Sequence, residues 1–151
     1  MHTVRVKFIH SKAALPTKMT EGSAGYDLYA VEDMEIPPSC CTSDGGAEVG
    51  RALVPTGIVL ELLPGTVGRV GSRSGMSVKS NIETGAGWID SDYRGELKVE
   101  LKNLSSVPYK ISCGDRIAQL VILSLPNVKI EAVEEVKDTS RNSGGFGSTG
   151  A

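Results

Sequence analysis

Apolar and polar residues alternate along much of the chain, which is the pattern of half-buried β-strands. The alternation is clearest at 96–102, where Leu97, Val99 and Leu101 share one face and charged residues occupy the other. Residues 4–8 alternate in the same way. Sustained helical periodicity is missing from the sequence, and the one helix that it predicts is short, near 74–80. Further strands are predicted at 58–62, 67–70, 117–125 and 128–133.

Turn-forming residues separate these strands. The chain has 18 glycines and 7 prolines, many of them in pairs between the apolar runs. Many short strands with frequent turns are typical of an all-β sandwich or barrel. The polar stretch 39–50 predicts a surface loop, and 151 residues fit one domain.

The glycine-rich C-terminus differs from the rest of the chain. Residues 139–150 can bury little apolar surface, so a disordered terminus is one interpretation. Arg141 and Phe146 stand among small donor-rich residues, so the segment could also become ordered over a ligand.

Composition and charge exclude several classes of protein. The net charge is −2 and no basic block stands out, which argues against binding nucleic acid through phosphate neutralisation. No apolar run could cross a bilayer, and the N-terminus lacks the apolar stretch of a secretion signal. The three cysteines, Cys40, Cys41 and Cys113, cannot all pair within the chain and lack zinc-site spacing. We therefore expect a soluble intracellular protein, cytoplasmic or nuclear, with ordinary thiols.

The residues available for chemistry narrow the choice further. The histidines, His2 and His10, lie in or beside the first strand, which argues against a catalytic Ser-His-Asp or Cys-His relay. A nucleotide-binding P-loop motif does not occur. Carboxylates, arginines, hydroxyls and glycine-rich backbone remain, and these groups suit phosphate chemistry assisted by magnesium.

Two early segments carry candidate groups. Asp27 follows a small-residue turn, where it could act on a ligand or simply cap the turn. Arg73 precedes the predicted helix, so its guanidinium and the backbone N–H groups there could bind an anion. The alternative for the second segment is helix capping by Ser72 or Ser74.

Two later segments carry a larger number of candidate groups. In 85–95, glycines allow close backbone approach, and Asp90 and Asp92 share one face of an extended chain. One could orient a water while the other pairs with Arg94; the alternative is a polar turn with a local salt bridge. In 114–120 we expect an ion pair between Asp115 and Arg116. Gln119 would share the apolar side of its strand unless a bulge intervenes.

Together, and in this order, segments 24–28, 73–75, 87–95, 114–120 and 141–150 resemble the five motifs of the trimeric dUTP pyrophosphatases, or dUTPases. The resemblance spans 23–150. It implies a jelly-roll β-barrel or sandwich with one short helix and a homotrimer with active sites shared between subunits. It also implies a barrel domain at 1–138 and a flexible arm at 139–151 that closes an active site.

The activity implied by the resemblance is Mg²⁺-assisted hydrolysis of dUTP to dUMP and pyrophosphate. This reaction keeps uracil out of DNA and supplies dUMP for thymidylate synthesis. Asp90 would be the general base that orients the water attacking the α-phosphorus, and Asp27 would hold the magnesium shell through water. Direct nucleic-acid or membrane binding is not expected.

Substrate-binding roles follow from the same resemblance. The positions that match phosphate or water contacts are Arg73, Ser74, Gly75 and Gln119. Tyr93 would pack under the deoxyribose. The uracil edge would be read by backbone at 85–89, including Gly85, Gly87 and Ile89. In the arm, Phe146 would stack on uracil, and the γ-phosphate would be gripped by Arg141, Ser148 and Thr149. Gly147, next to Phe146, is the remaining substrate-binding position.

The chain departs from the family pattern at three places. Ser72 stands where proline is usual, Trp88 replaces a smaller aliphatic residue, and the stretch between Ile36 and Val54 is longer than usual. Two other functions remain as alternatives. One is a dCTP deaminase, which shares the fold; the other is a non-catalytic nucleotide-binding sensor.

Overall fold

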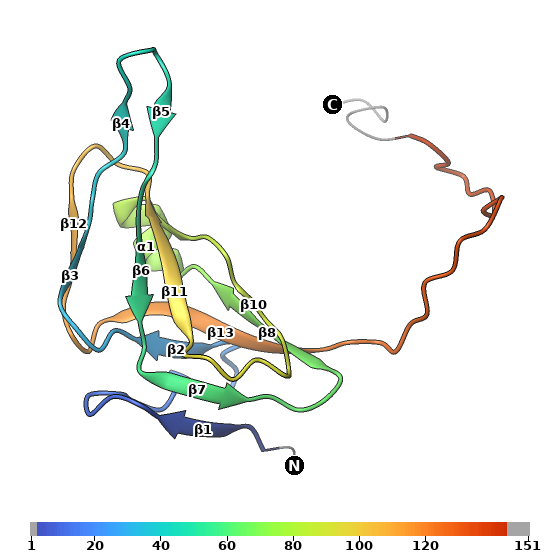
Figure 1. Ribbon diagram of the computed structural model, residues 1–151, viewed down its shortest axis with the longest axis horizontal. Coiled ribbons are helices and arrows are strands. Elements are labelled where there is room, and N and C mark those ends of the chain that lie inside the picture. The colour runs from blue at the N-terminus through green and yellow to red at the C-terminus, as the bar shows by residue number, and fades with distance from the viewer. Residues whose placement is uncertain (1–2, 145–151) are drawn as a thin grey trace.

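The computed structural model describes residues 3–144 and consists mostly of β-strands with one short helix (Figure 1). In chain order the elements are β1 (Arg5–Phe8), β2 (Tyr26–Tyr29), β3 (Met34–Ile36), β4 (Cys40–Cys41), β5 (Ala47–Glu48), β6 (Gly50–Pro55), β7 (Ile58–Glu61), β8 (Thr66–Gly71), α1 (Ser74–Ser80), β9 (Ile82–Thr84), β10 (Trp88–Ile89), β11 (Lys98–Asn103), β12 (Tyr109–Ile111) and β13 (Arg116–Ser124). The predicted all-β class and the predicted helix near 74–80 are confirmed.

The strands form several small antiparallel sheets. The largest has the order β10-β8-β13-β2, and a three-stranded sheet has the order β6-β11-β9. The pairs β1-β7, β12-β3 and β4-β5 make up the rest within the described residues. Strands distant in sequence are neighbours, so long-range pairing brings the early, middle and late segments of the chain together.

Alternation along β11 shows how the sequence produces this arrangement. Val99 and Leu101 are buried, while Lys98, Glu100 and Lys102 between them are more exposed. Leu97, just before the strand, is also buried. Side chains of this kind from both larger sheets and from β3 and β7 form one apolar core, whose members include Leu28, Ile36, Val54, Ile58, Val70, Ile82, Ile117 and Leu120.

Truncating a core leucine should destabilise the protein strongly. Leu101 is 1% exposed, so Leu101→Ala is expected to lower the free energy of unfolding by about 2–5 kcal/mol, through lost burial and a residual cavity. Equilibrium unfolding in urea measures this. Leu104→Ala is the matched control, because Leu104 is 53% exposed and its truncation should cost about 1 kcal/mol or less. Equal losses in the two variants would contradict this description of the core.

Segment 39–50 lies at the surface, as the predicted surface loop would, but it contains a two-stranded hairpin that its composition did not indicate. It forms the hairpin β4-β5, which projects from one end of the molecule (Figure 1). The Asp44 carboxylate accepts hydrogen bonds from the Thr42 hydroxyl and from the Gly46 N–H (3.2 Å), and Gly45 has a φ of 83°. All four strand residues are exposed, so the hairpin is held by local turn chemistry and not by the core.

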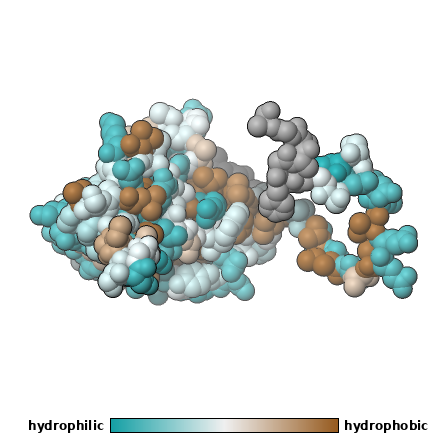
Figure 2. Space-filling model, turned by 90° about the horizontal axis from the view of Figure 1, so that it is seen from above, coloured by the Kyte–Doolittle hydropathy of each residue, from teal (hydrophilic) through white to brown (hydrophobic). Residues whose placement is uncertain are grey.

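The strand predicted at 128–133 is wrong for the single chain. After β13 the chain is extended but unpaired, and Val128 and Ile130 are 70% and 94% exposed. Figures 1 and 2 show this extension leaving the body with apolar and polar residues interspersed along it. A β-strand requires a neighbouring strand for its backbone hydrogen bonds, and the described residues provide none at this point.

None of the helical structure within 3–144 is long and apolar enough to cross a bilayer.

Candidate active site

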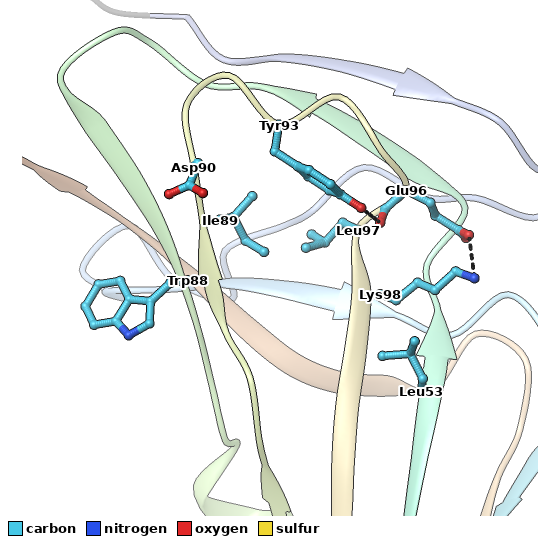
Figure 3. Close-up of a pocket in the computed structure, with 8 residues that line it drawn as sticks. All are labelled: Leu53, Trp88, Ile89, Asp90, Tyr93, Glu96, Leu97 and Lys98. Carbon is cyan, nitrogen blue, oxygen red and sulfur yellow. Dashed lines mark hydrogen bonds and ion pairs between the residues drawn. The ribbon is translucent and has the colours of Figure 1, made fainter.

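A cleft beside the candidate residues lies between the segment 88–93 and β11. Its volume of about 510 Å³ is within the range of small-molecule sites. Figure 3 shows Asp90, Ile89 and Tyr93 on one side and Leu97, Lys98 and Leu53 on the other. The lining residues are Leu53, Trp88, Ile89, Asp90, Tyr93, Glu96, Leu97 and Lys98. We call this the Asp90 pocket.

Glycine at 87 permits the wall of this pocket to form. A Cβ on Gly87 would lie 2.6 Å from both the Arg69 guanidinium and the Val70 carbonyl oxygen, which is too close for any side chain. The Val70 N–H donates to the Gly87 carbonyl at 2.8 Å, and Trp88 then pairs with Arg69 on β8. Glycine therefore allows β10 to lie against β8 and sets where the next residues emerge.

The turn after β10 is closed by its own backbone. The Tyr93 N–H donates to the Asp90 carbonyl at 3.1 Å. Arg94 donates to the carbonyl oxygens of Ser91 (2.8 Å) and Tyr93 (2.9 Å). The ion pair that Arg94 could form with Asp90 or Asp92 is absent among the described residues, because the guanidinium instead donates to the carbonyl groups of the turn.

Two polar side chains of this segment, Asp90 and Tyr93, line the pocket, and they differ in their contacts. The Tyr93 hydroxyl donates to the Glu96 carbonyl at 3.2 Å, which fixes the ring across the pocket (Figure 3). The carboxylate of Asp90 is exposed, and within the described part of the chain it accepts no hydrogen bond and forms no ion pair. It therefore has its acceptor oxygens free for a water or a ligand hydroxyl.

A second cluster of charged groups surrounds Asp27 on β2. Its carboxylate lies 3.4 Å from Arg73 Nε and 3.2 Å from Arg116 Nη1, and the residue is only 9% exposed. The Arg73 guanidinium also donates to the Arg116 carbonyl at 2.6 Å. One buried carboxylate thus joins three segments of the chain and offsets part of the charge of two arginines.

The sequence predicts an ion pair between Asp115 and Arg116, but the structure does not contain it. Asp115 lies in the turn before β13, and its carboxylate accepts the Ser112 N–H at 2.8 Å. Arg116 begins the strand and reaches across to Asp27 instead. Adjacent residues of an extended chain point in opposite directions, so sequence neighbours are poorly placed to pair.

Gln119 joins the Asp27 cluster because of a bulge. The register of β13 against β2 shifts between Arg116 and Ala118, which places Gln119 opposite Asp27 on one side and Gly71 on the other. Its amide donates to the Ser72 carbonyl at 2.9 Å. A Cβ on Gly25 would lie 2.5 Å from the Gln119 side-chain oxygen, so glycine is needed there for Gln119 to fit.

The turn between β8 and α1 exposes backbone next to this cluster. Arg73 occupies the N-cap position without a side-chain capping bond, so capping by Ser72 or Ser74 is not observed. Ser74 and Gly75 are exposed, and space around Gly75 is open. The helix ends at Asn81, which has a left-handed φ of 54° and whose N–H bonds back to the helix.

Ser72 instead bonds to β9. Its hydroxyl donates to Glu83 Oε2 at 2.5 Å and accepts the Thr84 N–H at 2.9 Å. The other oxygen of Glu83 accepts the Ser77 hydroxyl. The donation by Ser72, and secondly by Ser77, lowers the pKa of Glu83 below its usual value. Sequence patterns gave no signal for this contact between β9 and the turn.

The candidate residues thus lie in two groups that share no pocket in one chain. Gly87, Ile89, Asp90 and Tyr93 belong to the Asp90 pocket, whereas Asp27, Arg73 and Gln119 belong to the Asp27 cluster. Gly85 lies just before the pocket, against Glu100. Arg141 lies on the extension, where it donates to the Gly144 carbonyl at 2.8 Å. The remaining arm candidates, Phe146, Gly147, Ser148 and Thr149, lie outside the described residues.

Pocket residues that the sequence did not single out are Leu53, Glu96 and Lys98. Glu96 accepts the Gly57 N–H at 2.9 Å and lies 3.6 Å from Lys98. In the sequence these charges belong to the ordinary alternation of a strand, so no pattern distinguished them from solvent-facing residues.

The chain is similar over nearly its whole length to proteins of known family. The dUTPase family profile matches residues 11–150. The deoxyuridine 5′-triphosphate nucleotidohydrolase of Paramecium bursaria Chlorella virus 1 is 43% identical over 150 residues, covering 99% of each chain. That of Candida albicans is 45% identical, covering 98% of this chain and 88% of the relative.

Solved structures agree with these relatives. The Staphylococcus bacteriophage 80alpha dUTPase with dUpNHpp has a TM-score of 0.87 and 27% identity, covering all of both chains. The dUTPase from phage phi11 of S. aureus, in a form described with a structural Mg(II) ion, has a TM-score of 0.78 and 26% identity, covering 89% of this chain and 98% of that one. On the strength of the profile and the relatives, this chain belongs to the dUTPase family.

Proposed function

We propose that this protein hydrolyses dUTP to dUMP and pyrophosphate. The observation that carries the proposal is the Asp90 pocket, in a chain of the dUTPase family: it offers an unpaired carboxylate beside a fixed aromatic ring. The reaction would lower the supply of uracil for DNA synthesis and provide dUMP for thymidylate synthesis.

The separation of the two residue groups supports a shared site. Base and triphosphate of one nucleotide must contact both groups, yet in a single chain Asp90 and Tyr93 line one pocket and Arg73 lines another. We propose that the chain forms a jelly-roll homotrimer in which the Asp90 pocket of one subunit faces the Asp27 cluster of another. The barrel at 1–138 would then supply the body of each site, and the arm at 139–151 would close over it.

In this site Asp90 acts as the general base. Its carboxylate holds the attacking water and accepts its proton as the water adds to the α-phosphorus in line with the departing pyrophosphate. Because charge spreads over the phosphoryl oxygens in the transition state, positioned donors and cations contribute most of the rate enhancement. The groups that supply them are Arg73, Ser74, Gly75 and Gln119 and, from the arm, Arg141, Ser148 and Thr149.

Recognition of uracil and deoxyribose falls to the Asp90 pocket. Backbone groups at 85–89, including Gly85, Gly87 and Ile89, hydrogen-bond the uracil edge, so that cytosine leaves buried groups unpaired. The Tyr93 ring lies under deoxyribose and leaves no space for a 2′-hydroxyl. Phe146, next to Gly147 in the arm, stacks on the base and excludes water.

The protein itself supplies only some of the ligands that a magnesium ion at this site would need. Among residues 3–144 no three metal-ligating side chains cluster, so a cage built by one chain is not available there. Asp27 offers hard carboxylate oxygens beside the arginines of the phosphate region, which suits contact through water. Mg²⁺ commonly keeps several waters and takes other ligands from substrate phosphates. When bound it would neutralise phosphate charge in the transition state.

The direct test is release of pyrophosphate from dUTP by the purified protein with Mg²⁺. Parallel reactions with dCTP, dTTP and UTP measure discrimination at the base and at the sugar. We expect rapid release from dUTP and little from the others. Ammonia release from dCTP would instead establish a deaminase, and binding of dUTP without turnover would establish a sensor.

A further inference from the structure

We infer that Glu83 is a positioning residue for the turn 72–75, acting through the hydroxyls of Ser72 and Ser77. This inference rests on the proposed function, in which the turn binds the triphosphate. Glu83 itself touches no substrate in this account. It fixes where the phosphate-binding groups of the turn stand before substrate arrives.

One carboxylate connects the two sides of the turn. Ser72, just before Arg73, donates its hydroxyl to Glu83 Oε2 at 2.5 Å, and Ser77 in α1 donates to Oε1. Hydrogen bonds to an ionised carboxylate are stronger than neutral ones. The same two bonds keep the pKa of Glu83 low, so it is ionised at neutral pH.

Ser72 is held on two further sides. Its hydroxyl oxygen accepts the Thr84 N–H at 2.9 Å and lies 3.2 Å from the Thr84 hydroxyl. A hydroxyl has one donor and two acceptor positions, and here each has a partner. The Ser72 carbonyl accepts the Gln119 amide. The residue thus links β9, β13 and the turn.

Neither the start of α1 nor Gly75 supplies a side-chain restraint on the turn. It lacks a side-chain cap and an acidic residue in the first helical turn, and α1 is only seven residues long. Gly75 has open space around it and the conformational freedom of glycine. Donors that stabilise a transition state must be ordered before the reaction, and Glu83 adds an anchor at the Ser72 hydroxyl and at α1 to those already on Arg73 and on the Ser72 carbonyl.

The geometry favours an indirect role over direct contact. Both Glu83 oxygens are occupied by hydroxyl donors, and its cross-strand neighbour on β11 is Lys102. A carboxylate occupied in this way is engaged in holding the turn and has little capacity left to bind a ligand directly. Its position on β9 makes it part of the frame behind the turn.

The test compares the binding of two ligands by Glu83→Gln. Titration calorimetry of the intact protein with Mg²⁺ measures affinity for dUpNHpp, which has three phosphates, and for dUMP, which has one. We expect about a 10-fold loss for dUpNHpp, and less than about a 2-fold loss for dUMP, because only the former depends on the whole turn. Glu83→Asp should recover part of the loss.

Two further variants complete the experiment. Ser77→Ala removes one bond to the carboxylate and should give a smaller loss of the same selectivity; combined with Glu83→Gln it should add nothing. Glu61→Gln on β7, whose partner is Arg5, is the matched control and should leave both affinities unchanged. Equal losses for the two ligands, or no loss in Glu83→Gln and Ser77→Ala, would overturn the inference. Failure of the wild-type protein to hydrolyse dUTP while it binds dUpNHpp would refute the proposed function alone.

Discussion

Replacing Asp90 by asparagine is expected to lower kcat for dUTP hydrolysis by about 10²–10⁴-fold. The amide has nearly the size of the carboxylate but cannot accept a proton from the attacking water. The Asp90 carboxylate has no hydrogen bond or ion pair within the described residues, so its replacement should leave the fold and the affinity for dUpNHpp nearly unchanged. Pyrophosphate release and calorimetry measure the two effects separately.

Asp92→Asn is the matched control for this prediction. Asp92 is exposed in the same turn, two residues away, and does not line the Asp90 pocket. Its replacement should leave kcat within about 2-fold of wild type, because surface substitutions away from the reacting groups have small effects. An equal loss of kcat in both variants would mean that the rate depends on the negative charge of the turn and not on Asp90 as a general base.

Removal of residues 139–151 is expected to lower kcat/KM for dUTP by about 10²-fold or more, through loss of γ-phosphate contacts and of closure over the substrate. Stability should not change. The described part of this segment is exposed throughout, apart from Gly144, and makes only local hydrogen bonds. Thermal unfolding with and without the segment measures the second expectation.

The ligand dependence of this truncation distinguishes an active-site arm from a passive tail. Affinity for dUpNHpp should fall, whereas dUMP lacks the γ-phosphate that Arg141 would grip. Arg141→Ala in the full chain should reproduce part of the loss. A truncated protein with full activity would show that the segment takes no part in the reaction.

The alternating patterns predicted the strands well where both faces of a strand have distinct surroundings. At β11 the alternation of Val99 and Leu101 with charged residues identified the buried face correctly. At 128–133 the same reasoning failed, because an apolar pattern records what a segment could bury and not whether a partner is present. The hairpin at β4-β5 was missed because its turn chemistry leaves no apolar signature.

The candidate site was predicted in parts. The sequence put Asp90 in a polar turn segment and left open a bulge that would take Gln119 off the apolar side of its strand; the structure has a turn there with Asp90 exposed, and the bulge. It could not indicate that Arg116 chooses Asp27 over Asp115, since that choice depends on how β13 lies against β2. The anchoring of Ser72 by Glu83 likewise depends on the position of β9, eleven residues along the chain. Local patterns determine which groups are present, while long-range pairing determines which of them meet.

Trp88 gives the protein an intrinsic optical reporter. It is the only tryptophan in the chain, it is 64% exposed, and it lines the Asp90 pocket with the Arg69 guanidinium 5.0 Å from its ring centroid. Indole emission responds to changes in solvation and to nearby charge. Fluorescence excited at wavelengths that indole absorbs and the four tyrosines do not therefore arises from a single wall of the Asp90 pocket. Its change on mixing with a nucleotide would follow occupancy of that wall in real time.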